Sequence, residues 1–385
     1  MRGVAVIGTG AIAAVHIEAW LSFPDRCRVL ALCDLYPDKA RALNGKYRLG
    51  AQVYEDYREA LKRPDIDLVS VCLPPSAHRD AAVAALEAGK HAVVEKPMAA
   101  SLEECDAMIR AADKSGRLLS VVAQNRFKAP AMKVKSIIES GQAGRILHAA
   151  ANSLWWRGQS YYDLWWRGTW SGEGGGCTLN HAVHQIDLLR WTIGMPDEVM
   201  AVISNANHGN SETEDLSVAI LRYPGGGLAQ ITASLVSHGE EQELVYQTEQ
   251  ARLSVPWAVR ASRPRENGFP EPDPETERRL QALYDAAPGP RREGHPGQLG
   301  NVLDAMEGRE PLLVDGREGR ATLELIIGIY KSAAEGRPVR FPLDPGDPFY
   351  RKDTMQAAMP RFHEKTKSVD NFTDTGITLG RDMGR

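Results

Sequence analysis

The first third of the chain alternates short apolar runs with segments of helical character. Each apolar run ends at glycine, proline or a polar residue, which is typical of a central parallel strand buried on both faces. The predicted strands cover 3–7, 28–33, 68–73, 91–94 and 118–122, and the predicted helices cover 11–20, 37–46, 77–88 and 102–115. Ser76 and Ser101 are expected to cap the last two helices. Strands separated by helices imply right-handed crossovers, so this region predicts a parallel, doubly wound Rossmann sheet.

The strict alternation stops near Gln124. Strand-like segments then follow one another with short, turn-rich connections, which favours an antiparallel sheet. These segments are 145–156, 198–205, 216–223, 228–237 and 241–254, and helices are predicted over 133–140, 177–193, 274–286, 295–306 and 316–336. The fold class is therefore α/β, with a second, α+β domain that holds an open antiparallel sheet. We expect a Rossmann domain over 1–123, a substrate-binding and oligomerisation domain over 124–342, and an arm on a neighbouring subunit or a disordered tail over 343–385.

Composition excludes several classes of protein. A chain of 385 residues exceeds what one hydrophobic core fills, which again favours two domains. The net charge of -4 gives no electrostatic case for binding nucleic acid or an anionic membrane. No apolar run is long enough to span a bilayer, and the first residues do not resemble a signal peptide. The five cysteines are scattered and odd in number, so we expect reduced thiols and a cytoplasmic protein.

A glycine fingerprint, GTGAIA at 8–13, follows the first predicted strand and opens the first helix. Gly8 permits a tight turn, Gly10 lets the backbone approach a pyrophosphate, and the small Ala13 lets the helix pack closely on the sheet. The helix N-terminus then offers N–H groups to the phosphates. Asp34 stands at the end of the second strand, where a carboxylate binds the adenosine ribose diol and repels a 2′-phosphate. These features predict NAD binding, in preference to NADP; the alternative is a turn whose small residues serve packing alone.

Two further segments carry candidate chemistry. Glu95-Lys96-Pro97 ends a buried apolar run, at the edge of the sheet where a ligand would lie. Asn180, His184 and Asp187 recur at i, i+4 and i+7 on the helix over 177–193 and therefore share one face. Polar residues on a buried helix need partners, which a ligand pocket or a backbone carbonyl could supply.

The spacing of His181, His184 and Asp187 also permits metal ligation, but no further ligand is evident nearby, so no metal is expected. Tryptophans gather between Trp155 and Trp170 and alternate with arginine and tyrosine. They could form core, yet rings beside forked donors also suit the faces and hydroxyls of a sugar.

The fingerprint, the Pro74-Pro75 turn, Glu95-Lys96-Pro97 and the His184 helix together resemble the glucose–fructose oxidoreductase/inositol dehydrogenase (Gfo/Idh/MocA) family, from the first strand to about Pro342. The segment 166–170, the glycine run after it and Asn180 are most similar to the nucleotide-sugar and glycoside 3-dehydrogenase branch. The resemblance implies an NAD-dependent oxidoreductase that acts on a secondary alcohol or ketone of a sugar, glycoside or cyclitol, works without a metal, and forms a homodimer or homotetramer through the C-terminal sheet.

The resemblance also implies roles for residues. His184 is the expected acid/base, Lys96 the expected stabiliser of alkoxide charge, and Asn180 a third catalytic group. Asn180 stands where many inositol dehydrogenases of the family have aspartate, which puts inositol specificity in doubt. The expected cofactor-binding residues are Gly8, Gly10, Ala11, Ile12, Asp34, Pro74, Pro75, His78, Glu95, Lys96, Gln124, Trp166 and Arg167. The expected substrate-binding residues are Lys96, Asn125, Arg126, Trp155, Arg157, Tyr161, Asn180, His181, His184 and His295.

Two alternatives remain open. An enzyme that keeps NAD tightly bound could perform net elimination or hydrolysis through transient oxidation of its substrate. A non-catalytic, NAD-binding regulator would keep the fingerprint but has no need for Lys96 or His184, and both are present.

Overall fold

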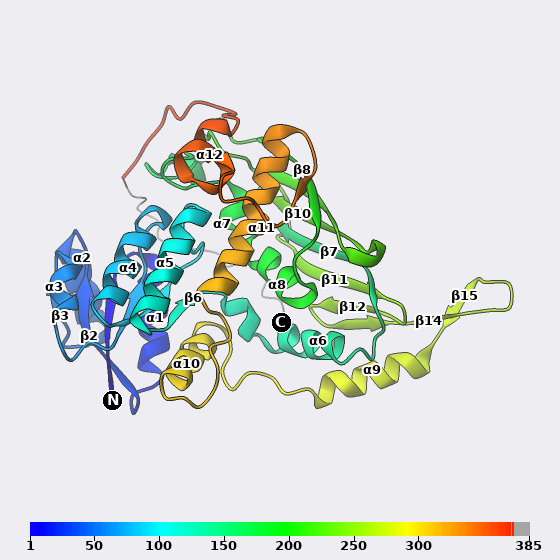
Figure 1. Ribbon diagram of the computed structural model, residues 1–385, viewed down its shortest axis with the longest axis horizontal. Coiled ribbons are helices and arrows are strands. Elements are labelled where there is room, and N and C mark those ends of the chain that lie inside the picture. The colour runs from blue at the N-terminus through cyan, green and yellow to red at the C-terminus, as the bar shows by residue number, and fades with distance from the viewer. Residues whose placement is uncertain (371, 373–385) are drawn as a thin grey trace. The chain divides into compact units, whose positions relative to one another are not determined.

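The structure, a computed structural model, describes residues 1–370 and 372, and it divides into two compact units (Figure 1). The N-terminal unit comprises Met1–Phe127, Arg291–Leu323 and Tyr350–Lys352. The C-terminal unit comprises Lys128–Pro290, Glu324–Phe349 and the residues from Asp353 onward. In the part of the chain that is described, no helix combines the length and the apolar character that crossing a membrane requires.

A six-stranded parallel sheet forms the centre of the N-terminal unit, in the order β3-β2-β1-β4-β5-β6. This confirms the predicted Rossmann architecture. The strands are β1 (Arg2–Ile7), β2 (Cys27–Cys33), β3 (Gln52–Tyr54), β4 (Leu68–Val71), β5 (His91–Val94) and β6 (Leu119–Val121). The helices are α1 (Ala11–Leu21), α2 (Pro37–Tyr47), α3 (Tyr57–Leu61), α4 (His78–Glu87) and α5 (Leu102–Ser115). The sequence analysis missed β3 and α3, which are short.

The two predicted helix caps have different outcomes. Ser101 accepts the backbone N–H of Glu104 and caps α5 as expected. Ser76 does not cap α4, because it lies inside a 3-10 turn, η1 (Pro75–Ala77), and the helix begins after that turn, at His78. The prolines therefore shift the start of the helix by one residue.

A helix from the far end of the sequence completes the N-terminal unit. Helix α10 (Gly294–Met306) packs against α1, and its Leu299, Val302 and Leu303 lie in one buried cluster with Ile17 and Trp20 of α1. Beyond it, Ser120 of β6 donates its hydroxyl hydrogen to Val314 O at 2.9 Å. The first domain therefore needs a segment that sequence order places about 170 residues later. Helix α11 (Gly316–Glu335) follows, and its residues are divided between the two units.

The C-terminal unit holds an eight-stranded sheet in the order β13-β12-β11-β7-β10-β9-β8-β16. The expectation of a wholly antiparallel sheet is wrong at one pair, because β10 runs parallel to β7. The predicted strand over 241–254 is also two strands, since Thr248 accepts the N–H groups of Gln250 and Ala251 at a tight turn. The strands are β7 (Ile146–Leu154), β8 (Glu198–Ser204), β9 (Leu216–Arg222), β10 (Leu228–Ser234), β11 (Gln242–Thr248), β12 (Arg252–Val255), β13 (Ala258–Arg260) and β16 (Val339–Arg340).

The predicted helix over 177–193 is broken. It consists of α7 (Cys177–Asn180) and α8 (Val183–Ile193), because the N–H of Ala182 bonds Cys177 O, five residues back, and interrupts the regular pattern. Asn180 therefore lies on α7 whereas His184 and Asp187 lie on α8. The argument that all three share one helix face is wrong for Asn180. The remaining helices of this unit include α6 (Ala129–Glu139) and α9 (Pro274–Ala286), with α9 as predicted.

The segment from residue 343 is not a free arm as far as the structure describes it. Helix α12 (Lys352–Ala358) is followed by a strap over 359–370 that bonds its own chain: Trp170 donates to Pro360 O at 3.0 Å, and Trp165 and Asp163 bond the backbone of Val369. The strap thus covers the tryptophan-rich segment. The rest of the predicted tail, residue 371 and residues 373–385, lies outside the described residues.

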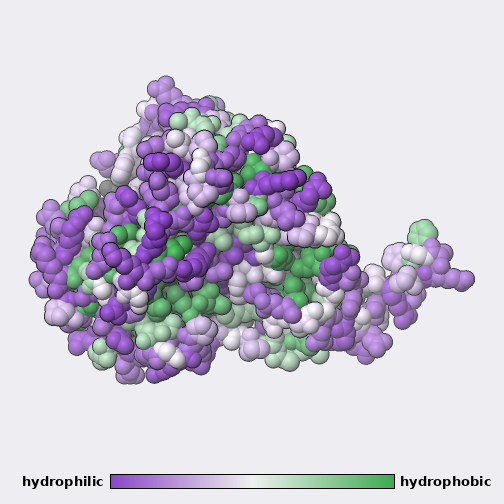
Figure 2. Space-filling model, in the orientation of Figure 1, coloured by the Kyte–Doolittle hydropathy of each residue, from purple (hydrophilic) through white to green (hydrophobic). Residues whose placement is uncertain are grey.

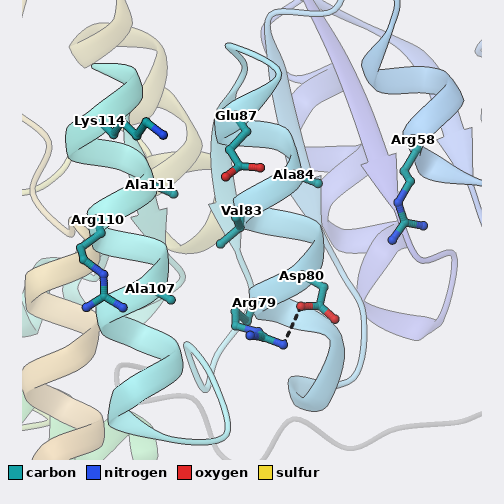
Figure 3. Close-up of a pocket in the computed structure, with 10 residues that line it drawn as sticks. All are labelled: Arg58, Arg79, Asp80, Val83, Ala84, Glu87, Ala107, Arg110, Ala111 and Lys114. Carbon is teal, nitrogen blue, oxygen red and sulfur yellow. Dashed lines mark ion pairs between the residues drawn. The ribbon is translucent and has the colours of Figure 1, made fainter. Parts of the chain in front are cut away.

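Two surface features complete the description. The hairpin of β14 (Ser262–Pro264) and β15 (Pro270–Pro272) projects from the sheet of the C-terminal unit, and its turn exposes Phe269 (Figures 1 and 2). On the N-terminal unit, a groove between α4 and α5 is lined by cations including Arg79, Arg110 and Lys114, with Arg79 paired to Asp80 (Figure 3). That groove contains none of the predicted site residues.

Candidate active site

The turn between β1 and α1 has the geometry that the fingerprint predicts. Gly8 has φ +89°, and a Cβ there would lie 2.5 Å from Cys72 O, so the fold itself demands glycine. A Cβ on Gly10 would meet no protein atom within 4 Å. Gly10 stands at the N-cap of α1 and provides no side-chain cap, which leaves the N–H groups of the first turn, at Ala11 and Ile12, available to an anion. The open space above Gly10 fits a phosphate better than it fits a packing role.

Asp34 is positioned by that same turn. Its Oδ2 accepts the backbone N–H and the hydroxyl hydrogen of Thr9, at 2.8 and 2.7 Å, and its Oδ1 accepts the N–H of Tyr36 at 2.9 Å. The carboxylate is only partly buried, at the carboxyl end of β2. Oδ1 can accept a further hydrogen bond, and rotation of the Thr9 hydroxyl would free a second acceptor position on Oδ2. These residues therefore fit a dinucleotide whose ribose hydroxyls donate to Asp34.

Two predicted cofactor residues are turned into the protein instead. His78 is fully buried, and its ring nitrogens lie 2.9 Å from Pro97 O and 2.8 Å from Leu73 O. Burial lowers the pKa of His78. The hydrogen bonds to the two backbone carbonyls act in the opposite direction, because they favour a proton on each ring nitrogen. The imidazole thus ties the Pro74-Pro75 turn to the Lys96-Pro97 segment. Pro74 is exposed and Pro75 is half-buried at this turn.

Glu95 is likewise buried, and its side chain does not face an open cofactor cleft. Its Oε1 lies 2.9 Å from His16 Nε2 and 3.5 Å from His295 Nε2, and its Oε2 accepts the N–H of Lys96 at 3.1 Å. Burial opposes ionisation, but hydrogen bonding and charge from the two histidines outweigh it and hold the pKa of Glu95 well below its usual range. His295, predicted to bind substrate, is therefore a neighbour of Glu95 at the start of α10.

The predicted site residues in the segment after β6 differ in burial and in hydrogen bonding. In the 3-10 turn η2 (Gln124–Phe127), Arg126 is completely buried and forms an ion pair with Glu318 at 2.7 Å, so its guanidinium is engaged by a partner within the protein. Asn125 is half-buried. The Oε1 atom of Gln124 is buried and accepts no hydrogen bond in the structure. An acceptor of this kind is costly to leave unpaired, which keeps Gln124 as a candidate ligand.

In the C-terminal unit, a buried carboxylate that the sequence analysis missed holds the start of α7. Glu214 accepts the N–H groups of Gly176 and Thr178, each at 3.0 Å, and the hydroxyl of Tyr330 at 2.9 Å. Burial raises the pKa of Glu214 to about 7, against these hydrogen bonds. Asn180 donates from Nδ2 to Gly175 O at 2.7 Å. Because glycine has no side chain, the backbone at Gly175 and Gly176 can approach Tyr330 and Glu214 closely. Gly175 O also holds the Asn180 amide in place.

Several predicted residues of the aromatic segment come together in that unit. Tyr161 Oη lies 3.2 Å from His181 Nε2 and accepts a hydrogen bond from Arg167. The Arg167 guanidinium lies over the rings of Tyr161 and Trp166, at 4.2 and 4.3 Å from their centroids. Trp155 meets the His181 ring edge-on, with centroids 5.9 Å apart. The cluster combines aromatic faces with polar donors, the combination that recognises a sugar ring.

Arg167 is held more firmly than a free binding residue. Its Nη1 lies 2.9 Å from Oε1 of Glu173, a carboxylate only 2% exposed, and Glu173 Oε2 accepts the N–H of Gly168 at 2.7 Å. Arg157, which was expected beside it, pairs with Glu240 at 2.5 Å and lies over the Trp155 ring. On α8, His184 is half-buried.

Comparison with known proteins agrees with both units. Residues 2–123 match the oxidoreductase family with an NAD-binding Rossmann fold, and residues 131–254 match the GFO/IDH/MocA C-terminal domain. The chain is 30% identical to the WlbA dehydrogenase of Bordetella pertussis, solved with NADH and UDP-GlcNAcA, over 89% of this chain and 98% of that one, with a TM-score of 0.77. It is 26% identical to the myo-inositol 2-dehydrogenase of Thermotoga maritima, over 88% of this chain and 98% of the relative. It is 29% identical to the levoglucosan dehydrogenase of Pseudarthrobacter phenanthrenivorans, over 50% of this chain and 55% of the relative.

Proposed function

Because the chain belongs to the GFO/IDH/MocA family of NAD-binding oxidoreductases, we propose that it oxidises a secondary alcohol of a sugar, glycoside or cyclitol, or reduces the matching ketone. One observation carries the proposal: the open turn at Gly10 and the fixed carboxylate of Asp34 form a dinucleotide cradle in a chain whose relatives are dehydrogenases of such substrates. The nucleotide-sugar branch is favoured because the chain is 30% identical to the WlbA dehydrogenase and 26% identical to the myo-inositol 2-dehydrogenase, over nearly the same share of the chain.

The cofactor is held by the N-terminal unit in this proposal. The phosphates lie at the N-terminus of α1, over Gly10 and Ala11, and the adenosine ribose hydroxyls donate to Asp34. Bound NAD supplies the nicotinamide ring that exchanges hydride with the substrate carbon. A 2′-phosphate would place two negative groups together at Asp34, so we propose a preference for NAD over NADP.

The catalytic roles follow from residue chemistry. His184 accepts the hydroxyl proton during oxidation and returns it during ketone reduction, the task for which an imidazole is suited near neutral pH. Lys96 donates a charge-assisted hydrogen bond to the same oxygen and stabilises its developing negative charge. Asn180, fixed through its Nδ2 by Gly175 O, offers its amide oxygen to a neighbouring hydroxyl donor. The Tyr161–Arg167–Trp155 cluster is the proposed surface for the sugar ring.

The proposed test begins with cofactor content. Mass spectrometry of the denatured, purified chain detects NAD that is carried through purification, and absorbance at the NADH band then reports turnover on UDP-GlcNAcA, myo-inositol and levoglucosan. We expect NADH to form with at least one of these compounds. Tightly bound NAD in one-to-one ratio with the chain, no free NADH and net conversion of the substrate would instead favour the internal-redox alternative.

Variants then assign the two catalytic roles. Lys96→Met should lower turnover about 100-fold or more by removing a charged donor, and His184→Ala should lower it roughly 10²–10⁴-fold by removing the base. Both variants should still bind NADH, as measured by NADH fluorescence, because the glycine fingerprint and Asp34 remain. Lys62→Met, an exposed lysine on the same unit, is the matched control and should leave turnover unchanged. Parent-like turnover by Lys96→Met or His184→Ala would remove that residue from the mechanism.

A further inference from the structure

We propose that His16, Glu95 and His295 form a binding site for a divalent transition-metal ion of the zinc class within the N-terminal unit. Their ligand atoms all lie within 4.8 Å of one another. The three residues come from α1, from the end of β5 and from the first turn of α10, so the cluster exists only when the unit is folded. Among the residues that the structure describes, this is the one group of three such side chains close enough to share an ion.

The spacing of the ligand atoms fits a tetrahedral ion. Zinc binds imidazole nitrogen and carboxylate oxygen at about 2.0–2.2 Å, so two ligands of one tetrahedral ion lie about 3.3 Å apart. The distances from Glu95 Oε1 to His16 Nε2 and His295 Nε2 are 2.9 and 3.5 Å, on either side of that value. The two imidazole rings meet edge-on with centroids 5.5 Å apart, so their nitrogens rather than their faces converge on the carboxylate.

The hydrogen bonding of the cluster leaves one ligand unused. The Nε2 atom of His295 is buried, and its contact with Glu95 Oε1, at 3.5 Å, is too long to satisfy it with a good hydrogen bond. Leaving a buried imidazole nitrogen without a partner is unfavourable. An ion beside Glu95 Oε1 would take this nitrogen as a ligand, and a small rotation of the His295 ring brings it closer.

The charge of the cluster also favours a cation. Glu95 is 4% exposed and His16 is fully buried, so water cannot solvate a charge on this carboxylate, and a positive partner within the protein would stabilise it. A divalent ion would supply the missing positive charge at the point where the three side chains meet.

The surroundings of His16 resemble the outer shell of a metal site. His16 Nδ1 lies 3.2 Å from Ser70 Oγ, and Ser70 Oγ is itself held by the indole N–H of Trp20 at 2.9 Å. With Nε2 on the ion, Nδ1–H donates to Ser70, which fixes the tautomer and the ring orientation. Two nitrogens and one oxygen suit zinc, cobalt or nickel and not magnesium or calcium, which prefer oxygen ligands alone.

The location indicates what the ion would do. Glu95 Oε2 accepts the N–H of Lys96, so an ion on Oε1 would fix the backbone that carries the lysine. Three protein ligands leave a fourth position for water. The influence on turnover rests on the role proposed for Lys96, whereas metal binding itself can be measured without any substrate.

The test uses the full chain without a polyhistidine tag. Elemental analysis of protein from zinc-supplemented cultures should find about one zinc per chain, and cobalt added to the metal-free chain should produce the visible absorption of a tetrahedral site. His295→Gln and Glu95→Gln should each weaken zinc binding at least 100-fold, while circular dichroism and a cooperative thermal transition confirm folding. His148→Gln, an exposed histidine, is the matched control and should bind zinc like the parent.

Two results would overturn the site. One is a parent chain that binds neither zinc nor cobalt at micromolar concentration, in which case the cluster is held by hydrogen bonds alone. The other is zinc binding that survives both substitutions. Lys96→Met separates this proposal from the proposed function, because that variant should keep its zinc while it loses turnover.

Discussion

The predicted site residues of this chain are of two kinds. Some are buried and bonded to groups within the protein, and others are exposed enough to bind a ligand. Arg126 and His78 were predicted to bind ligands, but both are completely buried and committed to Glu318 and to backbone carbonyls. Asp34 has the opposite character, since the groups that bond it orient a carboxylate that is still partly exposed. Residue type alone does not distinguish these cases, because the partner of Arg126 lies 192 positions away in the sequence.

Arg167 belongs to both groups, and its substitution should reveal this. Arg167→Met leaves the carboxylate of Glu173, which is 2% exposed, without its ion-pair partner. Breaking a buried pair from one side costs roughly 3–5 kcal/mol, so the free energy of unfolding in urea should fall by about that amount.

The double variant Arg167→Met/Glu173→Gln removes the stranded charge and should recover part of the lost stability. Arg222→Met, whose ion pair with Glu198 is exposed, is the control and should change stability by less than about 1 kcal/mol. If Arg167→Met unfolds at the same urea concentration as the parent, the pair with Glu173 is not a stabilising one.

At the scale of elements, structure that depends on neighbouring residues can be predicted from the sequence. Structure that depends on packing between distant segments cannot. The turn at Gly8 and Gly10 and the cap at Ser101 depend on a few neighbouring residues, and the sequence showed them. The start of α7 is held by Glu214, a residue more than 30 positions downstream, so no local pattern over 177–193 reports how this helix begins. The meeting of His16 with His295 requires α10 to pack on α1, which no local pattern reports.

The β1–α1 turn provides a matched pair of glycines for testing the cofactor site. Gly8→Ala should destabilise the chain, because φ is +89° and the new Cβ would lie 2.5 Å from Cys72 O. Gly10→Ala meets no protein atom within 4 Å and should leave the melting temperature unchanged. If the pyrophosphate lies against Gly10, Gly10→Ala should weaken NADH binding about tenfold or more, which corresponds to about 1.4 kcal/mol.

Calorimetry and NADH fluorescence on the two variants check these outcomes separately. Parent-like NADH affinity in a folded Gly10→Ala variant would place the phosphates elsewhere. Parent-like stability in Gly8→Ala would contradict the strained turn that the structure assigns to that position.

At the scale of the whole molecule, one face of the C-terminal sheet indicates self-association. Exposed apolar side chains on β8 and β9 stand opposite one another, with Val202 paired to Val218 and Met200 paired to Ile220, and Val202 is 66% exposed. Scattered surface hydrophobes are ordinary, but side chains that adjoin across two strands form a contiguous patch. The homodimer or homotetramer that the family resemblance implies would bury this patch against the same face of a second copy, in line with the two-fold symmetry of most oligomers.

Charges on the patch should therefore dissociate the protein without unfolding it. Val218→Glu/Ile220→Glu places two like charges on one face of β9, and in a self-complementary interface each pair would meet its own copy. Both side chains are exposed on the surface of the single chain, so the double variant should remain folded and keep a melting temperature close to that of the parent. Sedimentation equilibrium should show the parent at a multiple of the chain mass of 42.3 kDa and the double variant at the single mass. Leu35→Glu, which changes an exposed apolar position on the N-terminal unit, is the control and should keep the parent's mass. If the parent sediments as a single chain, the patch does not bind a second copy of this protein. If the double variant stays associated, the interface lies on another surface.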